Sequence, residues 1–260
     1  MPSIDDSKTV LVTGATAGIG RALALAISDL PSHPRVIATG RRKDRLEELR
    51  KSKLETIEVN LDTDKNELKK FVDDVLQKYP DLDTVILCAG IQHEFTLTGP
   101  IDIDKVTSEI NINYTSVVTL ISLFMPHFTK LATQGQPCFI VPVTSGLGIT
   151  PGPPVPNYSA TKAALHNFTI SLRVQLQGTN IHVLEIIPPL VESELHDAEG
   201  TTEALSKFWM SLDEYIPLTM NGLRKGDREI SAGGSLAALQ KFEPGKIEMA
   251  EAFQKARAAW

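Results

Sequence analysis

Two side chains with complementary chemistry lie four residues apart in the middle of the chain. Tyr158 and Lys162 belong to the segment YSATK at the start of an expected helix, and residues at i and i+4 share one helix face. An ammonium beside a phenol favours the phenolate and lowers a pKa that is normally about 10. The pair therefore predicts a proton donor or acceptor that works near neutral pH. For the pair alone, the alternative is an exposed helix start with a solvated lysine.

The composition limits the classes of protein to which this chain can belong. The chain has 260 residues, 42% of them apolar, and a net charge of −6, so no basic surface indicates nucleic acid or an anionic membrane. The histidines lack metal-ligand spacing. Cys88 and Cys138 lie in apolar runs and are expected to be buried thiols in a reducing, cytoplasmic compartment. The start, MPSIDDSK, is unlike a signal peptide, and no apolar run approaches the ~20 residues of a membrane helix.

The elements that must position the pair follow a regular alternation. Short apolar runs alternate with amphipathic segments, which predicts one domain (1–260) with a parallel sheet between helices. Strands are expected at 8–13, 35–39, 54–59, 84–88, 139–144, 181–187 and 229–232. Helices are expected at 18–30, 42–52, 64–79, 103–132 with a kink or break at Pro126, 158–177, 203–212, 212–225 and 247–260. Residues 233–245 read as a loop, and residues 234–260 are taken as a C-terminal tail.

A glycine-rich turn follows the first expected strand. The segment TGATAGIG at 13–20 has the spacing GxxxGxG, and it opens the first helix, whose N-terminal amides form an anion site. A glycine turn by chance is common, but its position between strand and helix favours phosphate binding. The residues expected to bind the phosphates of a cofactor are Gly14, Thr16, Ala17, Gly18, Ile19 and Gly20.

The end of the second expected strand indicates which dinucleotide binds. An acidic residue there would bind a ribose 2′-hydroxyl, whereas this chain has Gly40 followed by Arg41 and Arg42. Two guanidiniums can pair with a 2′-phosphate. The alternative is a pair of solvated arginines, although the positive end of the helix dipole disfavours them there. We therefore predict NADP(H) rather than NAD(H).

Several motifs in one order resemble the short-chain dehydrogenase/reductase family over residues 8–193. They are TGATAGIG, GRR at 40–42, Asp62, Ala89-Gly90, Asn113, Ser145 and YSATK. The resemblance implies a Rossmann-type doubly wound sheet of about seven strands and a catalytic set of Asn113, Ser145, Tyr158 and Lys162. Tyr158 would exchange the proton, and Lys162 would lower its pKa and hold the nicotinamide ribose. Ser145 would polarise the carbonyl, and Asn113 would hold a water, unless it is an ordinary polar helix residue.

The resemblance also implies contacts for the rest of the cofactor. Asp62 would meet the adenine, although it equally suits a helix N-cap. The nicotinamide end would be bounded by residues after the fourth and sixth strands, namely Ala89, Gly90, Pro188, Val191 and Ser193.

Three departures from the family pattern stand out. Leu87-Cys88-Ala89-Gly90 replaces a segment with two asparagines, which implies a more apolar brace. Pro189 stands where the family has glycine and removes an amide donor. The common C-terminal ending is absent. The helices that carry Asn113 and Tyr158 usually form a dimer interface, so a homodimer is expected.

The substrate is expected at the switch point, after the fourth, fifth and sixth strands and in the region 189–226. The candidates are His93, Leu147, Ile149, Leu190, Leu195, Phe208 and Trp209. Leu147, Ile149 and Leu195 equally suit the core, and His93 and His196 the surface. Most candidates are apolar, which favours NADPH-dependent reduction of a hydrophobic ketone or aldehyde. Oxidation in the reverse direction, a dehydratase or epimerase, and a nucleotide-binding regulator without turnover are the alternatives.

Overall fold

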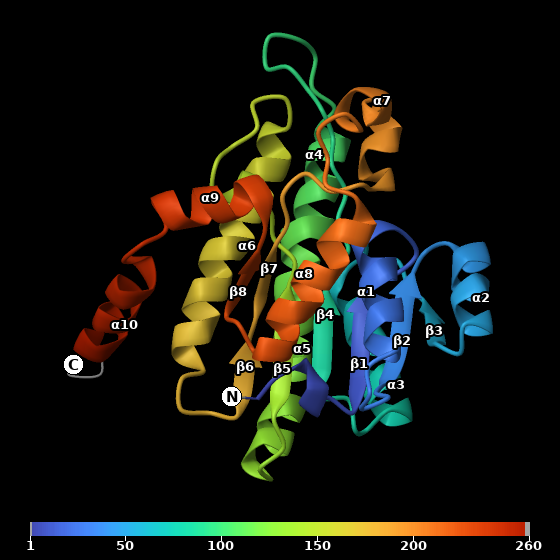
Figure 1. The fold of residues 1–260 in the computed structure, drawn as a ribbon, viewed down its shortest axis with the longest axis vertical. Coiled ribbons are helices and arrows are strands. Elements are labelled where there is room, and N and C mark those ends of the chain that lie inside the picture. Colours follow the sequence, from blue (N-terminus) through green and yellow to red (C-terminus); the bar gives the residue numbers. More distant parts are fainter. Residues whose placement is uncertain (1, 258–260) are drawn as a thin grey trace.

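A parallel β-sheet forms the centre of the molecule. The computed structural model describes residues 2–257 and is shown in Figure 1. Six strands pair in the order β3-β2-β1-β4-β5-β6, all in parallel. This arrangement confirms the predicted Rossmann-type fold. The strands are β1 (Thr9–Thr13), β2 (Arg35–Gly40), β3 (Glu55–Glu58), β4 (Thr84–Leu87), β5 (Cys138–Pro142) and β6 (Ile181–Val183).

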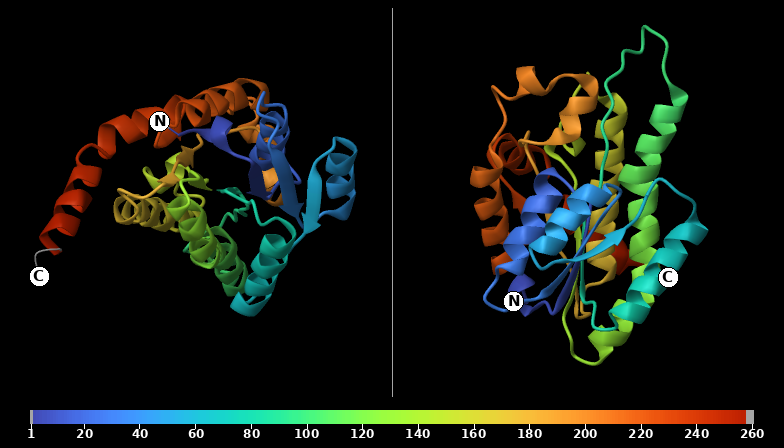
Figure 2. Two further views of the ribbon diagram at one scale, coloured as in Figure 1. Left: turned by 90° about the horizontal axis from the view of Figure 1, so that it is seen from below. Right: turned by 90° about the vertical axis from the view of Figure 1, so that its right-hand side faces the viewer.

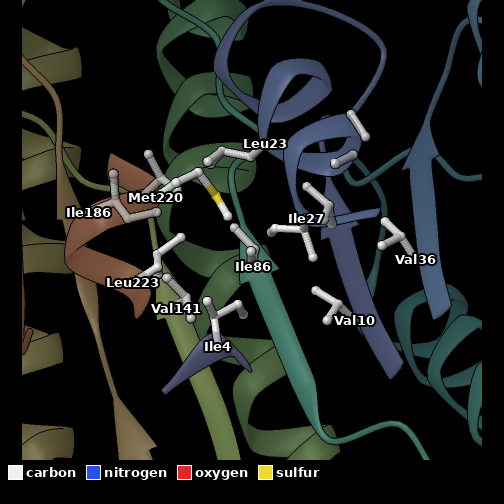
Figure 3. Packing of buried hydrophobic residues seen from close by; sticks show 14 of the residues in the cluster. Ile4, Val10, Leu23, Ile27, Val36, Ile86, Val141, Ile186, Met220 and Leu223 are labelled. Carbon is white, nitrogen blue, oxygen red and sulfur yellow. The ribbon is translucent and has the colours of Figure 1, made fainter. Parts of the chain in front are cut away.

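Helices cover both faces of the sheet (Figures 1 and 2). One face carries α1 (Gly18–Ser28), α2 (Lys43–Lys51) and α8 (Leu212–Lys225), and the other carries α3 (Lys65–Lys78), α5 (Ser116–Thr133) and α6 (Pro156–Gln175). Each face has its own apolar core, because the strands are buried on both sides. Figure 3 shows the α1 and α8 side, where Leu23 and Ile27 pack beside Met220 and Leu223.

The long helical segment after β4 departs from the prediction. It consists of α4 (Ile103–Ile110), a π-helical turn η2 (Asn111–Thr115) and α5. The expected break at Pro126 is absent, since α5 continues through that residue. Phe124 and Phe128 on either side of the proline are fully buried, and this packing holds the helix across the missing N–H. The irregular turn lies instead at the segment that carries Asn113.

The expected strand at 181–187 is divided into two. After β6 the backbone N–H of Leu184 still donates to Ile140, but Glu185 bonds to Arg228. Residues Glu185–Ile187 therefore form β7, which pairs in parallel with β8 (Glu229–Ser231). A bridge between Val143 and Ile186 joins this pair to the end of β5. The strand predicted at 229–232 is thus present, as the partner of β7.

The prediction of a loop at 233–245 is wrong. Gly233–Phe242 form helix α9, and α10 (Lys246–Arg257) follows and projects from the body of the molecule (Figure 1). Two glycines at the start suggested a loop, but SLAALQKF is a good helix sequence and Gly233, with φ of +51°, serves only as the entry. The last residues of the helix expected at 247–260, with Trp260, lie outside the described residues.

Short helical turns complete the structure. They are η1 (Ile4–Asp6), η3 (Gly146–Gly148), η4 (Glu194–Glu199) and α7 (Thr202–Leu205), the last replacing the longer helix expected at 203–212. Among the described residues, the helices are all too short or too polar to cross a membrane.

Candidate active site

One cavity of about 1240 Å³ opens at the carboxyl ends of β1, β4 and β5. The strand order reverses between β1 and β4, and this switch point is where ligands of doubly wound sheets bind. The volume exceeds the range of about 300–1,000 Å³ that is typical of small-molecule sites. The cavity therefore has space for a dinucleotide together with a substrate.

The glycine-rich turn forms one end of the cavity. Ala17 is the N-cap of α1 and offers no side chain to the first-turn amides, which leaves them available to an anion. The turn is tightly packed: a Cβ on Gly14 would lie 2.7 Å from the Cα of Ala89, and one on Gly20 would lie 2.5 Å from the Gly14 oxygen. Thr16, Ala17, Ile19 and Gly20 line the cavity with Gly14, whereas Gly18 is covered by Ser193.

A threonine at the end of β1 braces the next strand of the cavity wall. The Thr13 hydroxyl accepts hydrogen bonds from the amides of Cys88 and Ala89, at 3.0 and 3.1 Å. This contact ties the ends of β1 and β4 together beneath the cavity. Burial also raises the pKa of the Cys88 thiol to about 11, so it stays protonated. The segment Leu87–Gly90 was expected to brace the sheet by apolar contacts. Its bracing also has a polar component, which the Thr13 hydroxyl supplies.

Both predicted arginines lie at the cavity, next to the glycine turn. Arg42 donates from Nε to the Thr16 hydroxyl at 3.2 Å, and Arg41 lies on the exposed rim. The Arg42 guanidinium also pairs with Glu194, and so does Arg45 at 3.4 Å. Arg45 and Glu194 were not predicted, because they approach Arg42 only through the folded chain.

The catalytic candidates meet at the centre of the cavity. Tyr158 and Lys162 lie on α6, with the Lys162 Nζ 5.5 Å from the centre of the Tyr158 ring. Ser145 follows β5 as the N-cap of η3 and lines the same cavity. All three side chains are buried, at 7%, 4% and 8% exposure. The spacing in the sequence therefore does bring the phenol, the ammonium and the hydroxyl together.

The Tyr158 pKa shift differs from the sequence-based expectation. Burial raises the pKa of Tyr158 above its ordinary value, and the Ser145 hydroxyl opposes this shift. Burial also lowers the pKa of Lys162 to about 8, while its Nζ donates to the Val143 carbonyl at 2.8 Å. Desolvation, rather than the neighbouring Lys162, is the largest influence on the Tyr158 pKa, because it disfavours the charged phenolate. Tyr158 is thus held as the protonated phenol.

Asn113 binds the backbone of Ile91, next to the catalytic pair. Its side-chain oxygen accepts from the Ile91 amide, and its nitrogen donates to the Ile91 carbonyl, both at 2.9 Å. The same nitrogen donates to the Thr161 hydroxyl of α6 at 3.2 Å. A Cβ on Gly90 would lie 3.3 Å from the Asn113 oxygen and 3.7 Å from Lys162 Nζ. Asn113 therefore fixes the segment after β4 against α6, and the water-holding role stays a prediction.

Asp62 is occupied by a different contact from the one expected. Its carboxylate accepts hydrogen bonds from the hydroxyl of Ser108 at 2.6 Å and the amide of Asn111 at 2.8 Å. It does not line the cavity, whose wall there consists of Val59, Asn60 and Leu61. Asp64 is the N-cap of α3. The adenine contact of Asp62 stays a prediction, and its observed role is to anchor α4.

The segment after β7 closes the other side of the cavity. Pro188, Val191 and Ser193 all line it, as do Ala89 and Gly90 opposite them. The Pro188 carbonyl accepts from the Gly146 amide and from the Ser235 hydroxyl of α9, both at 2.9 Å. Helix α9 is thus built into the site, next to the turn that follows Ser145.

The expected substrate residues divide into two groups. His93, Leu147, Leu190 and Leu195 line the cavity. Ile149, Phe208 and Trp209 lie outside its lining, and Phe208 is 79% exposed. Placing Phe208 in the site was wrong because α7 ends at Leu205 and the chain then leaves the cavity. Lining residues that were not named from the sequence include Gln92, Val155, Leu205, Ser235 and Ala238. His196, for which a surface position was an alternative, is buried and lines the cavity.

The fold and this cavity define a doubly wound α/β protein with a ligand site at the switch point of its sheet. The short chain dehydrogenase family model matches residues 8–204, which is more than half of the chain. The protein therefore belongs to the short-chain dehydrogenase/reductase family.

Individual relatives agree with this assignment. The chain is 35% identical over 229 residues to the uncharacterized oxidoreductase DltE of Bacillus subtilis (strain 168), covering 86% of this chain and 88% of that one. It is 30% identical over 196 residues to the 3-oxoacyl-[acyl-carrier-protein] reductase FabG of Thermotoga maritima, covering 73% and 76%. In fold, it resembles a short-chain dehydrogenase from Sphingobium yanoikuyae in complex with NADPH, with a TM-score of 0.78 and 22% identity over 97% and 94% of the two chains.

Proposed function

We propose that the protein reduces a hydrophobic ketone or aldehyde to an alcohol with NADPH. The observation that carries this proposal is the meeting of Ser145, Tyr158 and Lys162 in one cavity with an uncapped helix start and an arginine pair. A regulator that only binds nucleotide has no need for a buried phenol, ammonium and hydroxyl at the switch point.

The residues present fit the dinucleotide along its length. The uncapped amides of α1 suit the pyrophosphate, and the segment 188–193 with Gly90 bounds the space for the nicotinamide. When bound, the nicotinamide supplies the hydride. The Lys162 ammonium lies close to Gly90, in the space for the nicotinamide, where it can donate to ribose hydroxyls.

Tyr158 supplies the proton for the carbonyl oxygen. Because burial keeps its phenol protonated, the hydroxyl is in the form that a reduction requires. Ser145 donates a hydrogen bond to the same oxygen and stabilises the negative charge that develops there. Asn113 keeps the segment 89–91 in place against α6, which positions the floor of the site.

Arg41 and Arg42 support the choice of NADP(H). No carboxylate belongs to the β2 end itself, and both guanidiniums lie at the rim of the cavity. Guanidiniums pair with phosphate oxygens through charge-assisted hydrogen bonds. A dinucleotide with a 2′-phosphate would therefore gain contacts that one without it lacks.

The remaining wall indicates an apolar substrate. Leu147, Val155, Leu190, Leu195 and Leu205 line the cavity that holds the catalytic groups, together with the polar Gln92, His93 and His196. Two relatives at about the same level of identity are named as reductases: sulfoacetaldehyde reductase 2 of Chromohalobacter salexigens, 31% identical over 192 residues, and the reductase of Thermotoga maritima. Both names describe carbonyl reduction in those proteins, which supports this direction here.

The setting that we propose is a homodimer in the cytoplasm. Cys88 and Cys138 are both free thiols, and a chain whose cysteines form no disulfide among the described residues suits a reducing compartment. The dimer would use α4, α5 and α6, the helices that carry Asn113 and Tyr158.

The direct test follows NADPH absorbance with a panel of aryl ketones, diketones and aliphatic aldehydes. We expect NADPH loss with at least the bulky apolar carbonyls, and slower loss with NADH. Tight NADPH binding without turnover of any carbonyl would contradict the proposal and favour a nucleotide-binding regulator.

A further inference from the structure

An acidic residue from the substrate side of the cavity lies on the predicted 2′-phosphate site. Glu194 is the first residue of η4 and follows Ser193, which covers Gly18 of the glycine turn. One carboxylate oxygen of Glu194 pairs with Arg42 Nη1, and the other lies 3.4 Å from Arg45 Nη2. The two guanidiniums belong to the start of α2, so this carboxylate joins opposite sides of the cavity.

A carboxylate and a phosphate compete for such a pair of guanidiniums. Both anions present oxygens that accept from the planar N–H donors of arginine. The two anions also repel each other when they share one site, so a 2′-phosphate and Glu194 cannot both hold Arg42 closely. A ribose 2′-hydroxyl is different, because it can donate a hydrogen bond to the Glu194 carboxylate while the ion pairs persist.

We propose that Glu194 is a specificity-determining residue that reduces the preference for NADP(H) over NAD(H). This inference rests on the proposed dinucleotide function and goes beyond the arginine pair. The 2′-phosphate displaces Glu194 from Arg42 and Arg45, whereas the ribose of NAD(H) leaves the ion pairs in place and gains a contact. In dinucleotide-binding folds, an acidic residue at the end of β2 contacts the ribose 2′-hydroxyl. Here Glu194, which lies 152 residues after Arg42, takes that role.

The environment of Glu194 allows this exchange. Its side chain is 39% exposed, and those of Arg42 and Arg45 are 42% and 37% exposed, so displacement moves no buried charge. The other end of η4 is held separately, by the contact of Glu199 with Nδ1 of His93 at 2.9 Å. Glu194 can therefore leave the arginines while the rest of the turn stays over the substrate side.

The test compares the dissociation constants of NADPH and NADH for the wild type and Glu194→Gln. Titrations followed by nicotinamide fluorescence require no substrate. Removing two half-exposed ion pairs that compete with the phosphate should tighten NADPH binding about three- to tenfold. Replacing the charged carboxylate by the weaker, neutral amide acceptor should weaken NADH binding about two- to threefold. The selectivity ratio should therefore rise in favour of NADPH.

Glu203→Gln is the matched control. Glu203 lies in α7, its side chain is exposed, and it makes no ion pair within residues 2–257, so this variant removes the same charge without touching the arginines. Its selectivity ratio should equal that of the wild type. An unchanged ratio in Glu194→Gln, an equal shift for both dinucleotides, or the same shift in the control would overturn the inference. If the wild type binds neither dinucleotide, the proposed function itself fails.

Discussion

The turn η3, which follows Ser145, packs closely against the catalytic helix α6 at Gly148. Gly148 lies at the end of η3, and a Cβ there would meet the backbone carbon and oxygen of Lys162 at 2.8 Å. Ordinary contact begins at 3.4 Å, so Gly148→Ala must separate η3 from α6 by about 0.6 Å. Backbone atoms of a helix cannot move aside as a flexible side chain can. The Ser145 hydroxyl therefore shifts relative to Tyr158 and Lys162.

The size of this shift sets the expected loss of activity. A displacement of 1 Å among catalytic groups can cost about a hundredfold in rate, so about 0.6 Å should lower kcat by about ten- to a hundredfold. The glycine turn packs against Ala89 and Ser193 rather than against η3, so the NADPH dissociation constant should change less than about twofold. The assay combines steady-state turnover of an accepted carbonyl with NADPH titration. Gly99→Ala serves as the control, because its Cβ would meet only Thr96 at 3.8 Å. A kcat within about twofold of wild type, in a folded Gly148→Ala protein, would refute the reasoning.

Two further predictions concern charge. Arg41→Ala should raise the NADPH Michaelis constant about tenfold and leave that for NADH nearly unchanged, because only the 2′-phosphate uses the guanidinium; equal effects would contradict the assignment. His166 on α6 contacts Glu185 at 2.7 Å and Glu243 at 3.1 Å. Burial alone lowers the pKa of His166, but these carboxylates outweigh it and raise the value to about 9. The resulting stability is fully present below the unfolded pKa of about 6.5, is worth on the order of 3 kcal/mol, and is lost as pH rises through about 9. In urea unfolding, the deficit of His166→Gln should therefore be largest near pH 6 and shrink above pH 9, and a deficit that grows with pH would oppose this account.

Much of the fold could be predicted because its signals are local. Strands buried on both faces read as continuous apolar runs, as in VLV after Thr9, and the intervening helices show an apolar face. The failures have local causes too. Gly233 and Gly234 hid α9, and nothing in the sequence of 111–115 distinguishes a π-helical turn from an α-helix. Pro126 looked disruptive because the chain does not reveal that it lies on the exposed side of α5, which the buried Phe124 and Phe128 hold in place.

The candidate site divides in the same way. Tyr158, Lys162 and the glycine turn follow from short spacings, and Ser145 from its position at a strand end. The contacts of Asp62 with Asn111 and of Glu194 with Arg42 join residues 49 and 152 positions apart, so only the folded chain reveals them. The burial of the Tyr158 phenol cannot be read from the sequence either. The direction of its pKa shift was therefore predicted incorrectly. Ser235 was missed because its helix was read as a loop.

The central claim is that the Tyr158 phenol supplies the proton for carbonyl reduction. The most direct measurement is the pair of turnover number and NADPH dissociation constant for Tyr158→Phe, with the best carbonyl of the panel. The ring and its packing persist in this variant, and only the hydroxyl is lost. We predict that kcat falls at least about a thousandfold, while NADPH binding changes less than about threefold. A kcat within about tenfold of the wild type, with NADPH still bound, would contradict the claim.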